Sequence, residues 1–129
     1  MQQQQKKFRA TVIVETHNGI LLARTGRGLL MLPGGGVDAG EQPISAAIRE
    51  LKEETELESI SAVFLFAHES AHYLHQVFHI SAVGAAKPSQ EITEIACYHD
   101  GLRRSLSRSS AEIIDKFLRH KYSPVTIAS

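Results

Sequence analysis

The chain has 129 residues, a length typical of one domain that buries roughly two-thirds of its unfolded surface. Lysine plus arginine and aspartate plus glutamate each number 14, so the zero net charge argues against a broad surface for nucleic-acid polymers. One cysteine, Cys97, excludes an internal disulfide framework, and the lack of an apolar run of about 20 residues or a signal-peptide core predicts a soluble, cytoplasmic protein with no membrane partner.

The first quarter of the chain predicts three short strands. Residues 1–7 form a polar, glutamine-rich tract that we expect to be disordered. Residues 8–15 (FRATVIVE) and 20–24 are rich in aliphatic side chains, and the turn at 16–19 contains Asn-Gly, the favoured hairpin pair. The two segments should therefore pair as a hairpin. A loop at 24–28 then leads to a short strand at 29–32.

Residues 33–57 predict a glycine loop (PGGG) followed by a helix, with Pro43 suited to its first turn. Glu50, Glu53 and Glu54 are spaced i, i+3, i+4 and would share one helix face, beside a separate apolar stripe formed by Ile44, Ala47, Ile48 and Leu51. Like charges at this spacing cost a few tenths of a kcal/mol, so stability alone would rarely select them. Clustered hard oxygen ligands on a rigid helix suit Mg²⁺ or Mn²⁺.

The rest of the chain predicts three further strands and a C-terminal helix. The strands are expected at residues 59–67, 72–83 and 94–99, with a loop at 87–90 and a loop or short helix at 100–108. Residues 110–120 predict an amphipathic helix with Ser110 as N-cap. We expect one domain over residues 8–120, a tail at 121–129, and an α/β fold with a mixed sheet between helical layers.

Residues 35–57 resemble the Nudix box, G-x5-E-x7-R-E-U-x-E-E-x-G-U, in which U is aliphatic. Eight of the nine specified positions match over these 23 residues, namely Gly35, Glu41, Arg49, Glu50, Leu51, Glu53, Glu54 and Leu57. The second glycine of the pattern is Glu56 here. A left-handed turn at that position costs Glu roughly 1 kcal/mol and leaves the carboxylates unaffected.

The resemblance implies a Nudix α/β/α sandwich with a mixed β-sheet and a loop–helix–loop catalytic motif. It also implies hydrolysis of a nucleoside diphosphate linked to another moiety, with Mg²⁺ or Mn²⁺ as cofactor. By match to the motif, Glu53 and Glu54 are the principal metal ligands and Glu50 is a further ligand or a base. The Gly35 carbonyl is a candidate ligand, and Arg49 orients a carboxylate. Glu41 is expected to brace the loop.

Residues outside the box supply further candidates. Family members often recruit one more carboxylate to position or deprotonate water; Glu91 and Glu94 are the options, and we favour Glu94 because it begins the strand-like EIACY. Substrate-binding residues are not fixed by a motif, and the candidates are His68, His72 and Tyr73. His75 and His79 would lie about 13 Å apart on one face of a strand, too far for one ion. Arg24 and Arg27 either contact phosphates or are solvated.

Three functions stay open. The leading one is a metal-dependent pyrophosphohydrolase acting on a small nucleotide-type substrate, which could be a nucleoside triphosphate, a dinucleoside polyphosphate or a nucleotide sugar. The second is a non-catalytic nucleotide-sensing module with the same fold, and the third a diphosphate isomerase. The isomerase needs an acid–base Cys and Glu pair, for which Cys97 alone is poor support. The sequence is compatible with a monomer or a homodimer.

Overall fold

Two four-stranded β-sheets form the centre of the molecule. The structure is a computed structural model that describes residues 5–122; most of the predicted N-terminal tract and of the predicted tail lie outside these residues. The first sheet has the order β5-β1-β7-β6, made of β1 (Lys7–Ile13), β5 (Gly34–Gly36), β6 (Glu58–Glu69) and β7 (Tyr73–Val83). Strands β1 and β7 are parallel and the other neighbours antiparallel, so this sheet is mixed, as predicted.

The second sheet begins directly after β1, the first strand of the chain. It contains β2 (Glu15–Thr16), β3 (Gly19–Thr25), β4 (Leu30–Met31) and β8 (Ile92–Cys97), with β8 paired antiparallel to β3. The predicted hairpin is confirmed only next to its turn, where Glu15 and Thr16 of β2 pair with Ile20 and Gly19. The expected pairing of the rest of residues 8–15 with 20–24 was wrong, because β1 pairs with β5 and β7 and most of β3 pairs with β4 and β8. The predicted loop or short helix after β8 is the 3₁₀ helix η1 (Asp100–Ser105).

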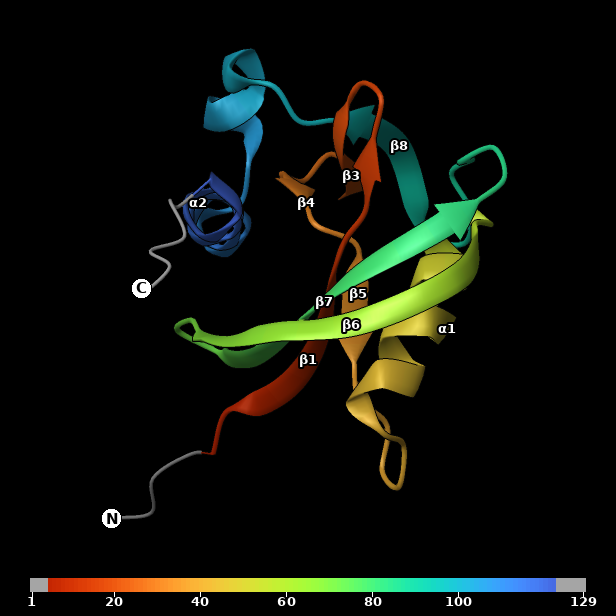
Figure 1. The fold of residues 1–129 in the computed structure, drawn as a ribbon, viewed down its shortest axis with the longest axis vertical. Helices are drawn as coiled ribbons and strands as arrows, with labels where there is room; N and C mark the ends of the chain where they lie inside the picture. Colours follow the sequence, from red (N-terminus) through yellow and green to blue (C-terminus); the bar gives the residue numbers. More distant parts are fainter. Residues whose placement is uncertain (1–4, 123–129) are drawn as a thin grey trace, which may run out of the picture.

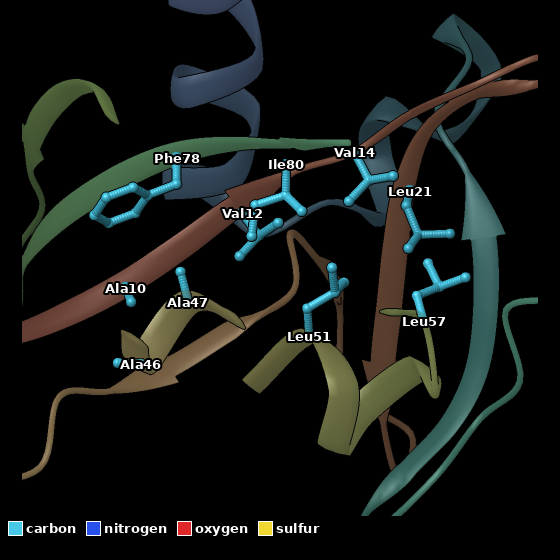
Figure 2. Close-up of a cluster of buried hydrophobic side chains, with 10 residues drawn as sticks. All are labelled: Ala10, Val12, Val14, Leu21, Ala46, Ala47, Leu51, Leu57, Phe78 and Ile80. Atoms are coloured by element: carbon cyan, nitrogen blue, oxygen red, sulfur yellow. The ribbon is translucent and has the colours of Figure 1, made fainter. Parts of the chain in front are cut away.

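Two helices cover opposite sides of the strands, α1 (Pro43–Thr55) on one and α2 (Arg108–Tyr122) on the other (Figure 1). Alternation along β1 sends Val12 toward α1 and Ile13 toward α2, and both side chains are fully buried. The cluster on the α1 side is drawn in Figure 2, where Leu51 points into it from the helix. The expected α/β/α sandwich is therefore confirmed.

Residues 34–36 form strand β5, so our prediction of a glycine loop there was wrong. The segment pairs antiparallel with β1, where Thr11 faces Gly34 and Ala10 faces Gly35. Gly34 has φ +148°, and a Cβ at this position would lie 2.1 Å from the Ala10 carbonyl oxygen. Glycine thus allows the two backbones to approach closely enough to pair, which extends the sheet up to the start of the acidic helix.

Ser110 does not cap the C-terminal helix, contrary to our prediction. Helix α2 begins at Arg108, and the Ser110 N–H donates to the Ser107 hydroxyl at 3.3 Å. The Ser110 hydroxyl is buried and instead accepts a hydrogen bond from the Leu32 N–H at 2.9 Å. The capping role passes to Ser107 because the Ser110 hydroxyl satisfies a buried backbone donor of the neighbouring chain segment.

Helix α1 ends at the position where the Nudix pattern has glycine. Glu56 adopts the left-handed conformation with φ 64°, and its N–H donates to the Lys52 carbonyl at 2.9 Å. We expect Glu56→Gly to raise the free energy of unfolding by about 1 kcal/mol, because glycine adopts this conformation without strain. Urea denaturation measures the change. Glu56→Ala keeps the Cβ and should give no such gain; an equal gain would assign the effect to loss of the charge.

Over residues 5–122, no helix has both the length and the apolar character needed to cross a membrane.

Candidate active site

Arg49 joins the acidic residues of the α1 region into one network. Its Nε donates to Glu41 Oε2 at 2.8 Å and its Nη2 donates to Glu41 Oε1 at 3.0 Å, which makes a bidentate pair. Its Nη1 donates to Glu50 at 2.9 Å and to Glu53 at 3.3 Å, and Nη2 also donates to the Gly36 carbonyl at 3.2 Å. One guanidinium therefore sets the positions of three carboxylates and of the end of β5.

Glu41 holds the loop before α1. Its Oε1 accepts a hydrogen bond from the Asp38 N–H at 3.0 Å while both oxygens pair with Arg49. Hydrogen bonding to Arg49 and to the Asp38 N–H lowers the pKa of Glu41 to about 2. Hydrogen bonds to Glu41 and Glu50 raise the pKa of Arg49 above its ordinary value. This geometry agrees with the expected bracing role of Glu41 and leaves it fully engaged within the protein.

Glu54 is the buried carboxylate of the group, with a relative exposure of 8%. Its Oε1 accepts a hydrogen bond from the Gly34 N–H of β5 at 2.8 Å. Burial raises the pKa of Glu54 to about 7, and the charges of Glu50 and Glu91 add to this, while the Gly34 hydrogen bond and the charge of Arg9 oppose it. A carboxylate desolvated beside other carboxylates favours a cationic ligand.

Glu50 packs against the neighbouring residue of β5, Gly35. A Cβ on Gly35 would lie 2.4 Å from the Glu50 carboxyl carbon and 2.5 Å from its Oε1. Only glycine therefore leaves room for this carboxylate against the strand. Glu50 and Glu54, one helical turn apart, are both held against the backbone of β5.

The residues present fit a hard divalent cation by donor type. Glu50, Glu53 and Glu54 offer carboxylate oxygens on one helix, and the Cβ-free Gly35 opens the space beside Glu50. Across residues 5–122, no three His, Cys, Asp or Glu side chains converge on one point for an ion. Glu53 is directed to Arg49, but 44% of its side chain is exposed, so it can turn toward an ion without disturbing the core.

A cleft of about 680 Å³ borders the Arg49 network. Asp38 and Glu41 lie on its acidic side, and Lys7, Phe8, Arg9 and Tyr73 line the remainder. The sequence did not point to Arg9 as a site residue. A single arginine in a strand rich in β-branched residues looks like an ordinary residue that faces solvent. Burial lowers the pKa of Arg9, against the opposing charges of Glu54 and Glu50, and its Nη2 donates to the Leu32 carbonyl at 3.3 Å.

The three candidate substrate residues separate in space. Tyr73 lines the cleft beside Arg49 and is 39% exposed. His72 lines a neighbouring cleft that shares Tyr73 with the first. His68 does not line either cleft, although its Nε2 lies 3.6 Å from Oε1 of Glu112, which lines the second; its ring centroid is 6.0 Å from that of His75. Of the three candidates, Tyr73 lines the cleft that Asp38 and Glu41 also line.

The two candidate carboxylates outside the box also separate. Glu94 on β8 pairs with Arg24 on β3 at 3.4 Å. Glu91 instead lies close enough to Glu54 for its charge to raise the pKa of that residue. The chain between α1 and β8 docks on the end of α1, where the Ser89 N–H donates to the Glu54 carbonyl at 3.1 Å. Glu94 is therefore engaged by Arg24, whereas Glu91 acts on Glu54 through its charge, and which of the two acts on water stays a prediction.

Residues 5–117 match the family model of the NUDIX domain. The chain belongs to the Nudix family. A Nudix-family structure from Chromobacterium violaceum superposes with a TM-score of 0.87 and 30% sequence identity, covering 97% of this chain and 85% of that chain. An ADP-ribose pyrophosphatase from Streptococcus suis 89-1591 has a TM-score of 0.74 at 18% identity, covering 95% of this chain and 97% of that chain. At this identity the second likeness concerns the fold alone.

An RNA pyrophosphohydrolase from Brucella anthropi is 58% identical to this chain over 33 residues, which are 26% of this chain and 19% of that relative. The chain therefore matches about a fifth of the length of this curated relative. Taken together, the comparisons confirm the predicted Nudix family.

One histidine of the Nudix domain has a structural role that predicts a pH effect. His75 is buried, with Nδ1 2.9 Å from Thr11 Oγ1 and Nε2 3.1 Å from Ser70 Oγ. Burial, aided by the charge of Arg9, lowers the pKa of His75 to about 4. Its contribution to stability is complete above the unfolded pKa of about 6.5 and is lost as pH falls toward 4.

We expect the free energy of unfolding to fall by about 2 kcal/mol from this group between pH 7 and pH 5. The His75→Gln variant should not show this decrease in the free energy of unfolding. The His17→Gln variant, which changes an exposed residue of a turn, should still show it. Urea denaturation of the three proteins at both pH values measures the difference. The same pH dependence in His75→Gln and the native chain would assign the effect to other groups.

Proposed function

We propose that this chain hydrolyses a phosphoanhydride bond in a nucleoside diphosphate linked to another moiety, and that it requires a divalent cation. The observation that carries the proposal is the arrangement of Glu50 and Glu54, which are held one turn apart against the backbone of β5. Glu53 is exposed on the same helix, and a cleft with basic side chains begins at Glu41, which Arg49 links to Glu50 and Glu53. Such a site pairs ligands for a cation with residues that attract phosphate.

Glu50, Glu53, Glu54 and the Gly35 carbonyl would hold Mg²⁺ or Mn²⁺. When bound, the cation would neutralise phosphate oxygens and lower the pKa of water. Arg49 keeps the carboxylates apart and oriented through its ion pairs. Arg49 is therefore a positioning residue for these carboxylates.

Cationic side chains of the cleft would bind the phosphate groups, Arg9 from inside and Lys7 from the rim. A water oxygen forms a new P–O bond as the bridging P–O bond breaks, and the departing phosphate carries away the electron pair. The proton released by water passes to a carboxylate, for which Glu91 is our candidate because the segment before it docks on the end of α1, where the Ser89 N–H donates to the Glu54 carbonyl at 3.1 Å.

Phosphate release from a panel of diphosphate compounds, with Mg²⁺ or Mn²⁺ and a coupling phosphatase, tests the proposal. We expect turnover of at least one nucleotide-type compound and none in EDTA. Silence across the panel, from folded protein that binds Mg²⁺, would favour the alternative of a nucleotide-sensing module.

An isomerase has less support. Cys97 lies on β8 with its Sγ 3.5 Å from Thr16 Oγ1, and it is absent from the residues that line the cleft beside Arg49. The acid–base Cys and Glu pair that such an enzyme needs is therefore not assembled in this cleft.

A further inference from the structure

Strand β6 has an outer edge that pairs with no strand within residues 5–122. It is the last strand in the order β5-β1-β7-β6, so β7 pairs with its inner edge only. The strand is 12 residues long, about twice the usual length. Its pairing with β7 is regular from Ser61 to Phe64, between two register shifts, whereas the Ala67 carbonyl near its end accepts from Lys116 Nζ at 3.3 Å. The regular stretch therefore presents backbone N–H and C=O groups on which another strand can pair.

The side chains of this edge do not oppose such pairing. Exposed edges are commonly protected by charged residues, especially lysine, or by proline, but residues 59–67 (SISAVFLFA) contain neither. The exposed fractions of their large apolar side chains are 68% for Ile60, 57% for Val63 and 52% for Phe64. Val63 lines an apolar groove of about 480 Å³ beside α2, whereas Phe64 packs on the Phe78 ring of the α1-side cluster, with 5.6 Å between centroids. The edge is therefore apolar on both faces of the sheet.

A second copy of this chain fits this edge by its own symmetry. Most soluble oligomers are built on two-fold axes, and two strands related by such an axis in one sheet run antiparallel. The uncharged stretch 59–67 is centred on Val63, so its full overlap with a second copy places Val63 opposite Val63 of that copy. The same register places Phe64 opposite Ala62 of the second copy, and the reverse. Each large ring then lies beside a small side chain on the α1 side of the sheet.

The charges at the two ends of β6 agree with this register. Glu58 forms an ion pair with Lys52 at one end, and Glu69 forms one with Lys6 at 2.8 Å at the other. Overlap centred on Val63 places Glu58 opposite His68 of the second copy, so no two carboxylates face each other directly. The net charge of the chain is zero, so the two copies carry no overall repulsion.

We propose that this chain forms a two-fold symmetric homodimer by antiparallel pairing of β6 with β6 of a second copy. The sheet that contains β6 then continues across both copies as eight strands, and the side chains of Ile60, Val63 and Phe64 are covered. The interface goes beyond the proposed function, since none of these three side chains lines the cleft beside Arg49.

Sedimentation velocity over about a hundredfold range of protein concentration tests the dimer. We expect the native chain to dimerise and Val63→Lys to raise the dissociation constant by about a hundredfold or more, because two lysines would face each other at the axis. The matched control is Leu29→Lys, which adds the same charge at a 52% exposed apolar residue just before β4 of the other sheet. Its dissociation constant should equal the native one. Circular dichroism checks the fold of both variants.

A cross-linking experiment tests the register without adding a charge. In a Cys97→Ser background, Val63→Cys should give a covalent dimer when a copper catalyst and oxygen oxidise the thiols. Directly opposite residues of antiparallel strands have Cα atoms about 4.5–5.5 Å apart, which a disulfide can span. Leu29→Cys in the same background should remain uncross-linked.

A native chain that stays monomeric at every concentration would overturn the dimer and leave the edge to an extended segment of another protein. A dimer whose dissociation constant is unchanged by Val63→Lys would place the interface elsewhere and would also overturn the proposal. The absence of a covalent dimer in Val63→Cys would overturn the register centred on this residue.

Discussion

Glu53→Gln is expected to lower the rate of phosphoanhydride hydrolysis in Mg²⁺ by about a thousandfold, or about 4 kcal/mol in activation free energy. The amide keeps the size of the side chain but removes the negative charge that would hold the cation. Nearly half of the Glu53 side chain is exposed, and its contact in the fold is the 3.3 Å bond from Arg49. The variant should therefore fold as the native chain does, with a stability change within about 0.5 kcal/mol.

Glu58→Gln is the matched control. Glu58 is also an exposed glutamate paired with a basic side chain, Lys52, but it lies on β6 beyond the helix. The hydrolysis rate of Glu58→Gln should stay within twofold of the native rate. The measurement is the initial rate of phosphate release from the substrate identified in the panel, with circular dichroism to check the fold. Retention of more than a tenth of the native rate by Glu53→Gln would remove Glu53 from the metal ligands.

The acidic face of α1 was predictable because it depends on neighbouring residues alone. A helical period places Glu50 and Glu54 on one side and Leu51 toward the core, and the structure has this arrangement. The C-cap conformation at Glu56 also depends on local geometry, since helices commonly end with a left-handed residue whose N–H satisfies one of the last carbonyls. The family resemblance rests on the same local pattern.

Features that depend on partners distant in sequence were not predictable in this way. Strand β5 exists because Gly34 allows close approach to Ala10, and the sequence of three glycines equally permits a loop. Arg9 becomes part of the site only when β1 pairs with β5 and with β7. The preference for Glu91 over Glu94 likewise depends on how the chain docks on the end of α1.

Arg49→Lys is expected to lower kcat about a hundredfold while changing KM little, because misplacement of catalytic groups by about 1 Å costs this much. The guanidinium uses donors on all three nitrogens to hold Glu41, Glu50 and Glu53. A lysine ammonium is a single point charge on a flexible stem and cannot form the bidentate pair with Glu41. The charge is kept, so the loss reports on geometry. A lower melting temperature should accompany it, because the loop before α1 loses its brace.

The companion variant Glu41→Gln separates positioning from direct contact with substrate. Both carboxylate oxygens of Glu41 accept hydrogen bonds from Arg49, and Oε1 also accepts one from the Asp38 N–H. Replacing the Glu41 carboxylate should therefore disturb catalysis only through Arg49. The double variant should then be scarcely slower than Arg49→Lys alone, which is the non-additivity expected of residues acting as one unit. Fully additive losses in kcat would mean that Glu41 and Arg49 act independently. A rise in KM with unchanged kcat in Arg49→Lys would instead place the guanidinium on the substrate.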